Sequence, residues 1–368
     1  MTHIKILFIA CISIPLLTRS YIDYESPFHP VVGNAGMVVS QNNLSSEIGI
    51  EILNMGGNAV DAAVAVGFSL AVTLPRAGNL GGGGFMLIYL KEIDEIYYID
   101  YRSKSPLNSN LENIFDLINE SNKSYNFIPN NFDEKKFDIL DTGYKASAIP
   151  GTVAGLLEAH SKFGRLSLEL ILQPAIKQAR EGIKVTYDFH KAIESTPRLL
   201  EDKESRTIYF NNGSPLQENT IIKFPDLANT IELISSEGRN GFYKGITAEK
   251  IVKAMKENDG LFSLDDFYNY EAHVRKPIST NYRDNIIYTS GAPSGGGITF
   301  LTALNILNNF DLKQYQSNSI TTYHLLSEAL RRGHNNRSSE VGDPLFYNVP
   351  HDKLLSNKRI KELSKTLM

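Results

Sequence analysis

The arrangement of apolar and polar residues first singles out residues 59–72, which are almost all small and apolar. Asn58 precedes this segment and Asp61 follows three residues later, the spacing of a capping box, so a helix is predicted over Ala59–Val72. A helix that is apolar on every side must be buried on every side, and its small residues allow neighbouring backbones to come close. Because a membrane span needs roughly 20 residues, the segment is predicted to be a core helix.

Shorter apolar or alternating runs predict strands. Phe85–Leu90 and Ile96–Tyr101 flank the polar turn Lys91–Glu95, which indicates a hairpin. Further strands are predicted at Gly36–Ser40, where the strand should be buried, and at Ile278–Tyr282 and Ile286–Thr289.

Serine, proline and glycine positions predict the helix boundaries. Ser45 and Ser46 are expected to cap a helix that stops at Gly56 and Gly57. From Pro150 onward the chain is expected to be mostly helical. Helix starts are predicted at Pro150-Gly151-Thr152, at Pro225, at Ser263 and at the glycine loop Ser294–Gly297 before Ile298–Asn309, and Pro174 is placed in the first turns of another helix. The Asn-rich stretch Asn108–Asp138 is expected to be a surface insertion or flap.

Composition indicates a globular chain. With 368 residues, 42% of them hydrophobic and 21% charged, the chain is long enough for one large domain or two ordinary ones, and long disorder is not expected. Lysine and arginine total 37 against 41 acidic residues, and no basic patch stands out. A nucleic-acid partner therefore has no electrostatic support.

The N-terminus has the pattern of an export signal. Lys5 precedes an apolar run at residues 6–17, and the small residues Thr18 and Ser20 allow cleavage before Tyr21. The alternative is an uncleaved segment that touches a membrane without spanning it. Cleavage would remove Cys11, the only cysteine, and would exclude disulfides, thiolate metal sites and a cysteine nucleophile. We expect residues 1–20 to be a signal peptide and the domain 21–368 to be exported, periplasmic or extracellular.

The glycine-rich segments do not match a phosphate-binding motif. The run Gly78–Gly84 lacks the third glycine of a dinucleotide turn and precedes a strand rather than a helix, and no Gly-Lys-Ser/Thr occurs. Consecutive glycines still require a close approach of the backbone to another strand or to a ligand. The histidines are scattered, and neither His-Glu-x-x-His nor Gly-x-Ser-x-Gly is present. No metal and no cofactor are expected.

Arg102 is the candidate binding residue. It follows the predicted strand Ile96–Tyr101, and Pro106 ends the extended segment soon after. An arginine at a strand end beside a glycine loop can hold a carboxylate with its two-pronged guanidinium. The alternative is an internal ion pair with Asp100 or Glu51.

Several motifs together make the sequence resemble the γ-glutamyltranspeptidase (glutathione hydrolase) family over about residues 34–365. The matching segments are Gly56–Ala63, Ala77–Met86, Asp100–Arg102, Pro150–Gly155, Gln173–Ala175, Phe242–Gly245, Ser294–Ile298 and Gly342–Pro344. Their order and number distinguish the resemblance from chance similarity.

The resemblance implies an α/β (α+β) chain with the N-terminal-nucleophile hydrolase fold, an αββα sandwich of two stacked sheets between helix layers. Family members cut themselves into a large and a small subunit. The threonine that then begins the small subunit attacks the γ-glutamyl amide and uses its own amino group as base. The glutamyl group passes to water or to an acceptor amine, no cofactor takes part, and an arginine at the position of Arg102 binds the substrate α-carboxylate.

The sequence departs from the family at the nucleophile. The motif Thr-Thr-His-Tyr/Phe-Ser, which contains the catalytic threonine, does not occur in these residues. Thr321 and Thr322 resemble it but open a helical stretch, where threonine is an ordinary N-cap. Thr366 lies too near the last residue to serve. At Arg331–Arg337 only Arg337 matches the family pattern. The packing of this segment, or the docking of a linker on it, is therefore expected to differ from that in the family.

Three hypotheses follow for the chain. It is a large subunit, incomplete and inactive without a small-subunit chain and exposing an apolar face for it, which would act on glutathione or other γ-glutamyl compounds. Alternatively it is a truncated inactive remnant that retains γ-glutamyl binding through Arg102. The third hypothesis is a periplasmic binding protein for small γ-glutamyl or amino-acid ligands, which would need a complete closed core.

Overall fold

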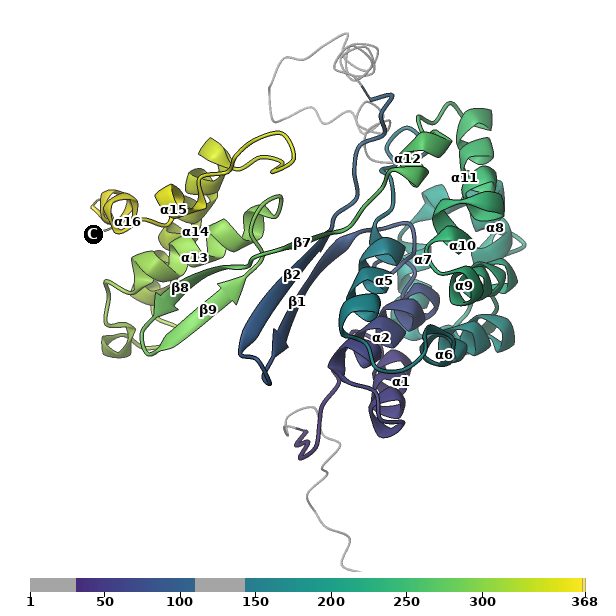
Figure 1. Ribbon diagram of the computed structural model, residues 1–368, viewed down its shortest axis with the longest axis horizontal. Coiled ribbons are helices and arrows are strands. Elements are labelled where there is room, and N and C mark those ends of the chain that lie inside the picture. The colour runs from purple at the N-terminus through teal and green to yellow at the C-terminus, as the bar shows by residue number, and fades with distance from the viewer. Residues whose placement is uncertain (1–30, 110–142, 366, 368) are drawn as a thin grey trace, which may run out of the picture. The chain divides into compact units, whose positions relative to one another are not determined.

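A computed structural model describes residues 31–109, 143–365 and 367. The chain divides into Met1–Met37 and Val38–Met368, and every helix and strand of the described residues belongs to the second unit (Figure 1). The predicted signal peptide 1–20, Cys11, Thr366 and nearly all of the predicted insertion lie outside the described residues.

The predicted apolar helix is confirmed as α2 (Ala59–Thr73). The Asn58 side chain accepts hydrogen bonds from the backbone N–H groups of Val60 and Asp61, and the Asp61 carboxylate accepts one from the Asn58 N–H at 2.9 Å. These are the reciprocal bonds of a capping box. The sequence pattern around Asn58 therefore fixes where α2 begins.

The preceding helix, α1 (Asn43–Asn54), begins earlier than predicted. Its N-cap is Asn42, whose side chain accepts from the Leu44 N–H. Ser45, predicted to be a cap, is buried within the helix, and its hydroxyl lies 2.8 Å from those of both Ser69 and Thr73 on α2. The hydroxyl thus joins two packed helices instead of capping one.

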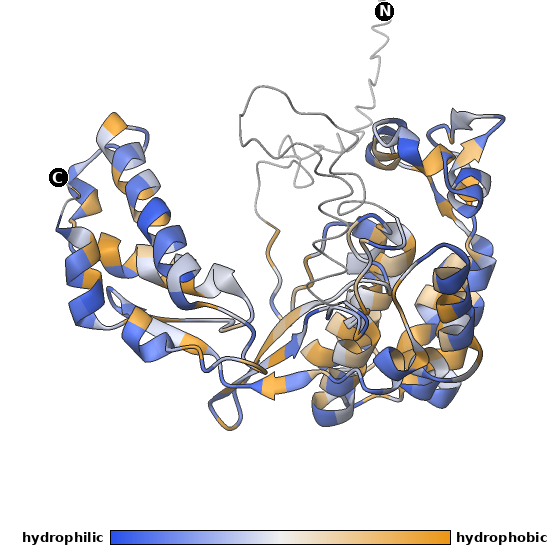
Figure 2. Cartoon of the chain, turned by 90° about the horizontal axis from the view of Figure 1, so that it is seen from above, coloured by the Kyte–Doolittle hydropathy of each residue, from blue (hydrophilic) through white to orange (hydrophobic). Residues whose placement is uncertain are grey.

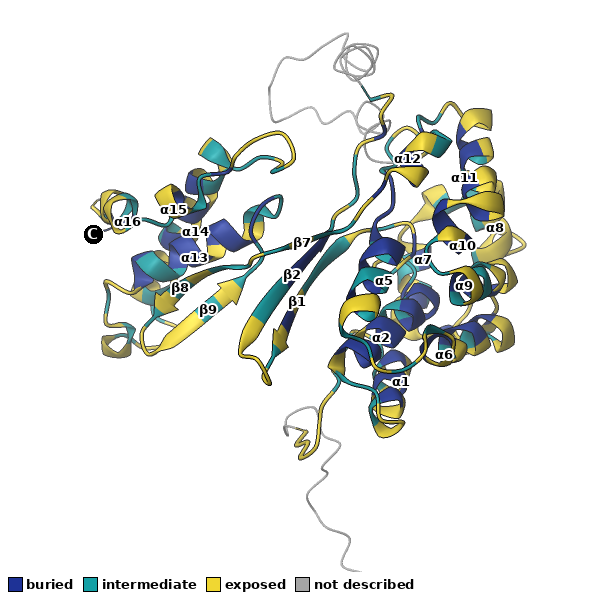
Figure 3. Ribbon diagram, viewed as in Figure 1, coloured by how far each residue is buried: buried dark blue, intermediate teal, exposed yellow. Residues whose placement is uncertain are grey.

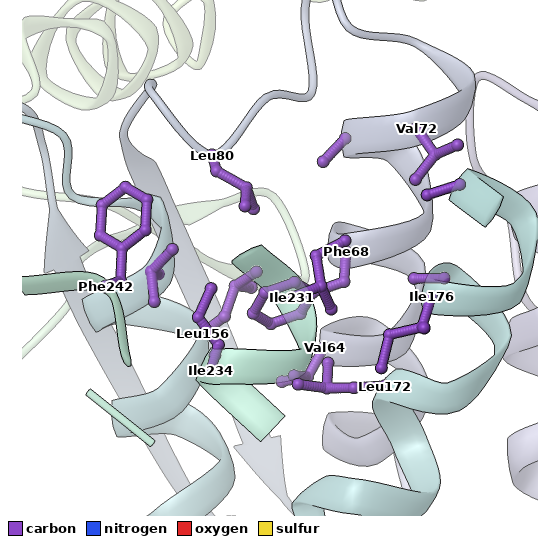
Figure 4. Packing of buried hydrophobic residues seen from close by; sticks show 14 of the residues in the cluster. Val64, Phe68, Val72, Leu80, Leu156, Leu172, Ile176, Ile231, Ile234 and Phe242 are labelled. Atoms are coloured by element: carbon purple, nitrogen blue, oxygen red, sulfur yellow. The ribbon is translucent and has the colours of Figure 1, made fainter. Parts of the chain in front are cut away.

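The main core gathers around α2, which packs against α1, α5 (Thr152–Phe163) and α6 (Leu168–Glu181). Figure 4 shows side chains of this core, Phe68 and Leu172 among them, in close packing. In Figure 2 the helices carry both hydrophobic and hydrophilic residues, as helices with one buried face do. Pro174 lies in the middle of α6, not in its first turns. Burial of the apolar face of α6 offsets the backbone hydrogen bond that a proline removes.

A three-stranded antiparallel sheet carries the end of the strand that precedes Arg102. Its order is β1 (Gly84–Leu90), β2 (Glu95–Tyr101) and β7 (His273–Arg275), so the predicted hairpin is confirmed. One face packs on α5 through buried side chains such as Ile88 and Ile99. On the other face Leu87 is 45% and Tyr89 56% exposed, and Figure 3 shows exposed positions along β1.

The strand predicted at Gly36–Ser40 is absent, and this prediction was wrong. The segment carries no strand, and Val39 is 82% exposed. A strand is stable only when a neighbouring strand satisfies its backbone groups, and among the described residues none pairs with this segment.

The predicted strands 278–282 and 286–289 are confirmed as the hairpin β8 (Ile278–Tyr282) and β9 (Asn285–Thr289). The second glycine loop forms the first turn of α13 (Gly295–Leu307), which packs on α14 (Ile320–Glu340). A Cβ on Gly297 would overlap the Ser290 carbonyl oxygen, so this glycine permits a close backbone approach.

The helix starts predicted at Pro225 and Ser263 are confirmed by α9 (Pro225–Glu237) and α12 (Leu264–Tyr268). The remaining elements are β3 (Ile183–Lys184), α7 (Tyr187–Glu194), a 3-10 turn at Pro197–Leu200, α8 (Lys203–Tyr209), β4 (Phe210–Asn211), β5 (Ser214–Pro215), β6 (Ile221–Ile222), α10 (Asn240–Tyr243), α11 (Gly245–Glu257), a 3-10 turn at Leu312–Gln314, α15 (His351–Leu354) and α16 (Asn357–Ser364). Within the described ranges, each helix lacks either the length or the apolar character of a transmembrane helix.

Candidate functional site

The first glycine loop packs directly behind Arg102. Gly82 accepts hydrogen bonds at its carbonyl oxygen from the N–H groups of Gly151 and Thr152, at 2.7 and 3.1 Å, where α5 begins. A Cβ on Gly83 would lie 2.5 Å from the Ser103 nitrogen. Packing on neighbouring backbone therefore explains these glycines, and the loop braces the segment that carries Arg102.

The backbone of Arg102 is held on both sides. Its N–H donates to the Asp100 carboxylate at 3.1 Å, and its carbonyl oxygen accepts from the Tyr270 hydroxyl at 2.8 Å. Tyr270 is 2% exposed and stacks on Tyr243, with ring centroids 5.6 Å apart. A buried tyrosine with a satisfied hydroxyl is a rigid support for the peptide it contacts.

The Arg102 side chain is exposed and lines a cavity of about 600 Å³. Its guanidinium forms no ion pair with any residue that the structure describes. The internal pair proposed from the sequence is not formed: the Asp100 carboxylate instead binds Arg275 of β7, with Oδ2 2.9 Å from Nε. Glu51 lies on α1 and forms no pair with Arg102 either. Because no carboxylate of the described residues pairs with it, the Arg102 guanidinium is available for an external anion.

Cations outnumber carboxylates around this cavity. The charged side chains that line it are Arg102, Lys104, Arg275, Asp100 and Asp343, His273 lies beside them, and the apolar part includes Pro106, Leu107, Leu345 and Phe346. Lys104 Nζ lies 3.3 Å from His273 Nε2 and 5.0 Å from the centre of the Tyr270 ring. Burial lowers the pKa of Lys104 from its ordinary value, while Asp100 opposes that shift. The composition of the cavity favours a small anion with an apolar or amphipathic remainder.

A sequence profile described as gamma-glutamyltranspeptidase matches residues 45–368. The chain belongs to the γ-glutamyltranspeptidase family. It is 38% identical to the glutathione hydrolase proenzyme of Escherichia coli K12 over 97% of its own length and 36% identical to that of Bacillus subtilis 168 over 94%. It spans only 59% and 56% of these two curated relatives.

Solved structures of the γ-glutamyltranspeptidase family share the fold. The crystal structure of Helicobacter pylori γ-glutamyltranspeptidase superposes with a TM-score of 0.84 at 35% identity, covering 92% of this chain and 94% of that one. The predicted α+β, N-terminal-nucleophile hydrolase fold is confirmed by this likeness and by the mixture of helices and sheets. The chain therefore matches nearly all of one crystallised chain but little more than half of the curated proenzymes.

The two threonines that resemble the family's nucleophile motif lie in the first turn of α14. Its N-cap is Ser319, so neither threonine is the cap that the sequence suggested. Thr322 Oγ1 donates to the Gln316 carbonyl at 2.9 Å. Neither Thr321 nor Thr322 lines the cavity that contains Arg102.

Sequence reasoning missed four residues of the site: Lys104, Tyr270, His273 and Arg275. His273 and Arg275 reach it only through the pairing of β7 with β2, and no local pattern marks that pairing. Asp343 was noted as part of a motif but not as a wall of the cavity. Within the described ranges, no group of three or more His, Cys, Asp or Glu residues is arranged to hold a metal ion.

Acidification is expected to destabilise the protein through His273. Burial, followed by the Lys104 charge, lowers the His273 pKa below its ordinary 6.5. The unfolded chain therefore binds the proton more readily, so this stabilisation is present above pH 6.5 and is lost as the pH falls. His351 acts in the same direction, since its Nε2 accepts from the Ala292 N–H and burial lowers its pKa. Urea unfolding at about pH 7.5 and 5.5 measures the loss.

The control for this pH effect is an exposed histidine outside the cavity. His273→Gln should reduce the loss of stability between the two pH values, whereas His334→Gln, on α14, should leave it unchanged. Equal losses in the wild type and in His273→Gln would contradict the expectation.

Proposed function

We propose that this chain is the large-subunit part of an enzyme that cleaves the γ-glutamyl amide of glutathione or a related compound. The glutamyl group would pass to water or to an amino acid or peptide. The observation that carries the proposal is the Arg102 guanidinium, which pairs with no carboxylate of the described residues and lines a cavity where cations predominate. Membership of the γ-glutamyltranspeptidase family supports it. We extend the proposal to export of the mature chain after removal of residues 1–20.

In this mechanism Arg102 binds the α-carboxylate of the γ-glutamyl substrate through two parallel N–H···O bonds. That contact fixes the position of the γ-carbonyl carbon. A threonine hydroxyl attacks this carbon while its own α-amino group takes the proton, and a glutamyl ester forms as the amine leaves with a proton. Water or an acceptor amine then attacks the ester and regenerates the threonine.

We propose that this threonine comes from a small-subunit polypeptide outside residues 1–368. Thr321 and Thr322 are unsuitable because both lie within the first turn of α14. The match to nearly all of the H. pylori chain, but to little more than half of the curated proenzymes, supports a large-subunit assignment.

The half-exposed apolar side chains of β1 support the large-subunit proposal over the binding-protein alternative. A periplasmic binding protein needs a closed core, yet Leu87 and Tyr89 of β1 are about half exposed. A truncated inactive remnant would retain the same face and the same Arg102. Only activity in the presence of a companion chain distinguishes the remnant from the large subunit.

Hydrolysis of γ-glutamyl-p-nitroanilide tests the proposal, with the intact mass of every polypeptide recorded. We expect no turnover from the 368-residue chain alone and turnover when a polypeptide with an N-terminal threonine accompanies it. Turnover by the lone chain would refute the external nucleophile. Absence of turnover with such a companion would favour the remnant, and a lone chain that is monodisperse would favour the binding protein.

A further inference from the structure

Arg102 lies beside a carboxylate that could neutralise it. Asp100 lies two residues before Arg102, on β2, and its Oδ1 accepts a hydrogen bond from the Arg102 backbone N–H at 3.1 Å. The carboxylate is therefore at the base of the Arg102 side chain, within reach if that side chain folds back. Asp100 is only 4% exposed, so water screens its charge weakly. Left without another cation, this carboxylate would compete with any external anion for Arg102.

Arg275 supplies that other cation from a distant part of the sequence. In the antiparallel pairing of β2 with β7, His273 lies opposite Asp100 and Arg275 opposite Tyr98. Asp100 and Arg275 are thus diagonal neighbours on one face of the sheet, where long side chains reach one another. Arg275 Nε donates to Asp100 Oδ2 at 2.9 Å, and the two side chains are 24% and 5% exposed.

The two oxygens of Asp100 have separate partners. Oδ2 receives Arg275, while Oδ1 receives the backbone N–H of Arg102. Asp100 therefore helps to hold the Arg102 peptide in place without binding its guanidinium. This arrangement depends on Arg275, because removal of one partner of a buried ion pair leaves an uncompensated charge, and Arg102 is then within reach of it.

We propose that Arg275 is a positioning residue that occupies the Asp100 carboxylate and so keeps the Arg102 guanidinium free for the substrate carboxylate. The inference rests on the proposed role of Arg102 in γ-glutamyl binding. It gives β7 a part in substrate recognition, although Arg275 itself need not touch the substrate.

The reactivity of Arg102 towards phenylglyoxal measures directly whether its guanidinium is free. The 368-residue chain is treated without ligand, and mass spectrometry of the peptide that contains Arg102 follows the modification rate. Arg275→Gln is expected to slow this rate roughly tenfold, the change that corresponds to one new charge-assisted hydrogen bond. Arg275→Lys, which keeps the charge, should react nearly as fast as the wild type.

Rescue by a second substitution separates competition for Arg102 from damage to the fold. Asp100→Asn combined with Arg275→Gln removes both the cation and the competing carboxylate, so the Arg102 rate should return close to that of the wild type. A merely structural role for the pair predicts no such rescue. An unchanged rate in Arg275→Gln, or a slow rate in the double variant, would overturn the proposal.

One further measurement and one substitute variant keep the result interpretable. Arg239 donates to the Tyr270 carbonyl and lies over the Tyr243 ring, so a constant Arg239 modification rate reports an intact fold. If Arg275→Gln does not fold, Arg275→Met keeps the packing of the side-chain stem and carries the same prediction.

A parallel experiment with a ligand distinguishes failure of this inference from failure of the proposed function. Protection of wild-type Arg102 by L-glutamate tests the proposed role of Arg102, whereas the rates without ligand test Arg275. In the active assembled enzyme, Arg275→Gln should raise KM roughly tenfold and change kcat much less, because the substrate contact exists before the chemical step.

Discussion

Replacing Arg102 with glutamine is expected to weaken binding of γ-glutamyl substrates roughly 10- to 150-fold, which corresponds to the loss of about 1.5–3 kcal/mol from a charge-assisted hydrogen bond. The guanidinium has no ion pair with the described residues, so its removal leaves no internal carboxylate newly unpaired. The stability of the chain should consequently change little. The measurement is KM for γ-glutamyl-p-nitroanilide in the assembled enzyme, together with urea unfolding.

Two comparisons assign this effect to the α-carboxylate. Arg102→Lys should bind with intermediate strength, because an ammonium group keeps the charge but loses the two-pronged geometry. Arg165→Gln changes an exposed arginine outside the cavity and should leave KM unaltered. A substrate with a carboxamide in place of the α-carboxylate should bind equally to the wild type and to Arg102→Gln. If Arg102→Gln still weakened the carboxamide as strongly, Arg102 would not be the carboxylate ligand.

Gly155→Ala is expected to lower the free energy of unfolding by about 1–3 kcal/mol, the usual cost of overpacking a filled core. Gly155 lies on α5 against β2, and a Cβ there would overlap Cβ and Cγ of Tyr101. These atoms are next to the backbone and cannot move aside as the end of a long side chain could. The helix preference of alanine, about 1 kcal/mol, offsets only part of the strain.

The matched control for Gly155 is Gly296, in the first turn of α13. An added Cβ at Gly296 meets nothing closer than the Ser294 hydroxyl at 3.7 Å. Gly296→Ala should therefore be neutral or slightly stabilising in urea unfolding. Because Tyr101 precedes Arg102, Gly155→Ala should also raise KM. If the two alanine variants had equal free energies of unfolding, Tyr101 would be able to move away from the added methyl group, and the expectation would be wrong.

Local features of the fold were predictable from the sequence. The capping box around Asn58 and the hairpin that ends at Tyr101 depend on residues a few positions apart, and the structure confirms both. Their success also placed Arg102 at a strand end. Gly36–Ser40 failed because its apolar pattern says nothing about whether a pairing strand is present.

The environment of Arg102 was harder to predict from the sequence, because it depends on contacts between distant segments. From the sequence, an internal ion pair of Arg102 with Asp100 remained an alternative to substrate binding. The pairing with Arg275 joins residues 175 positions apart and arises only when β7 pairs with β2. The buried Tyr270, which supports the Arg102 carbonyl, comes from the segment between α12 and β7. No motif in the sequence signals that such a support exists.

The two-sided hold on the Arg102 peptide has an entropic consequence. With its N–H bonded to Asp100 and its carbonyl to Tyr270, the backbone is already ordered before a ligand arrives. Capture of an anion then restricts only the torsions of one side chain, at a cost of about 0.5–1.5 kcal/mol, and no loop has to be immobilised. Most of the attraction between guanidinium and carboxylate therefore remains available as affinity.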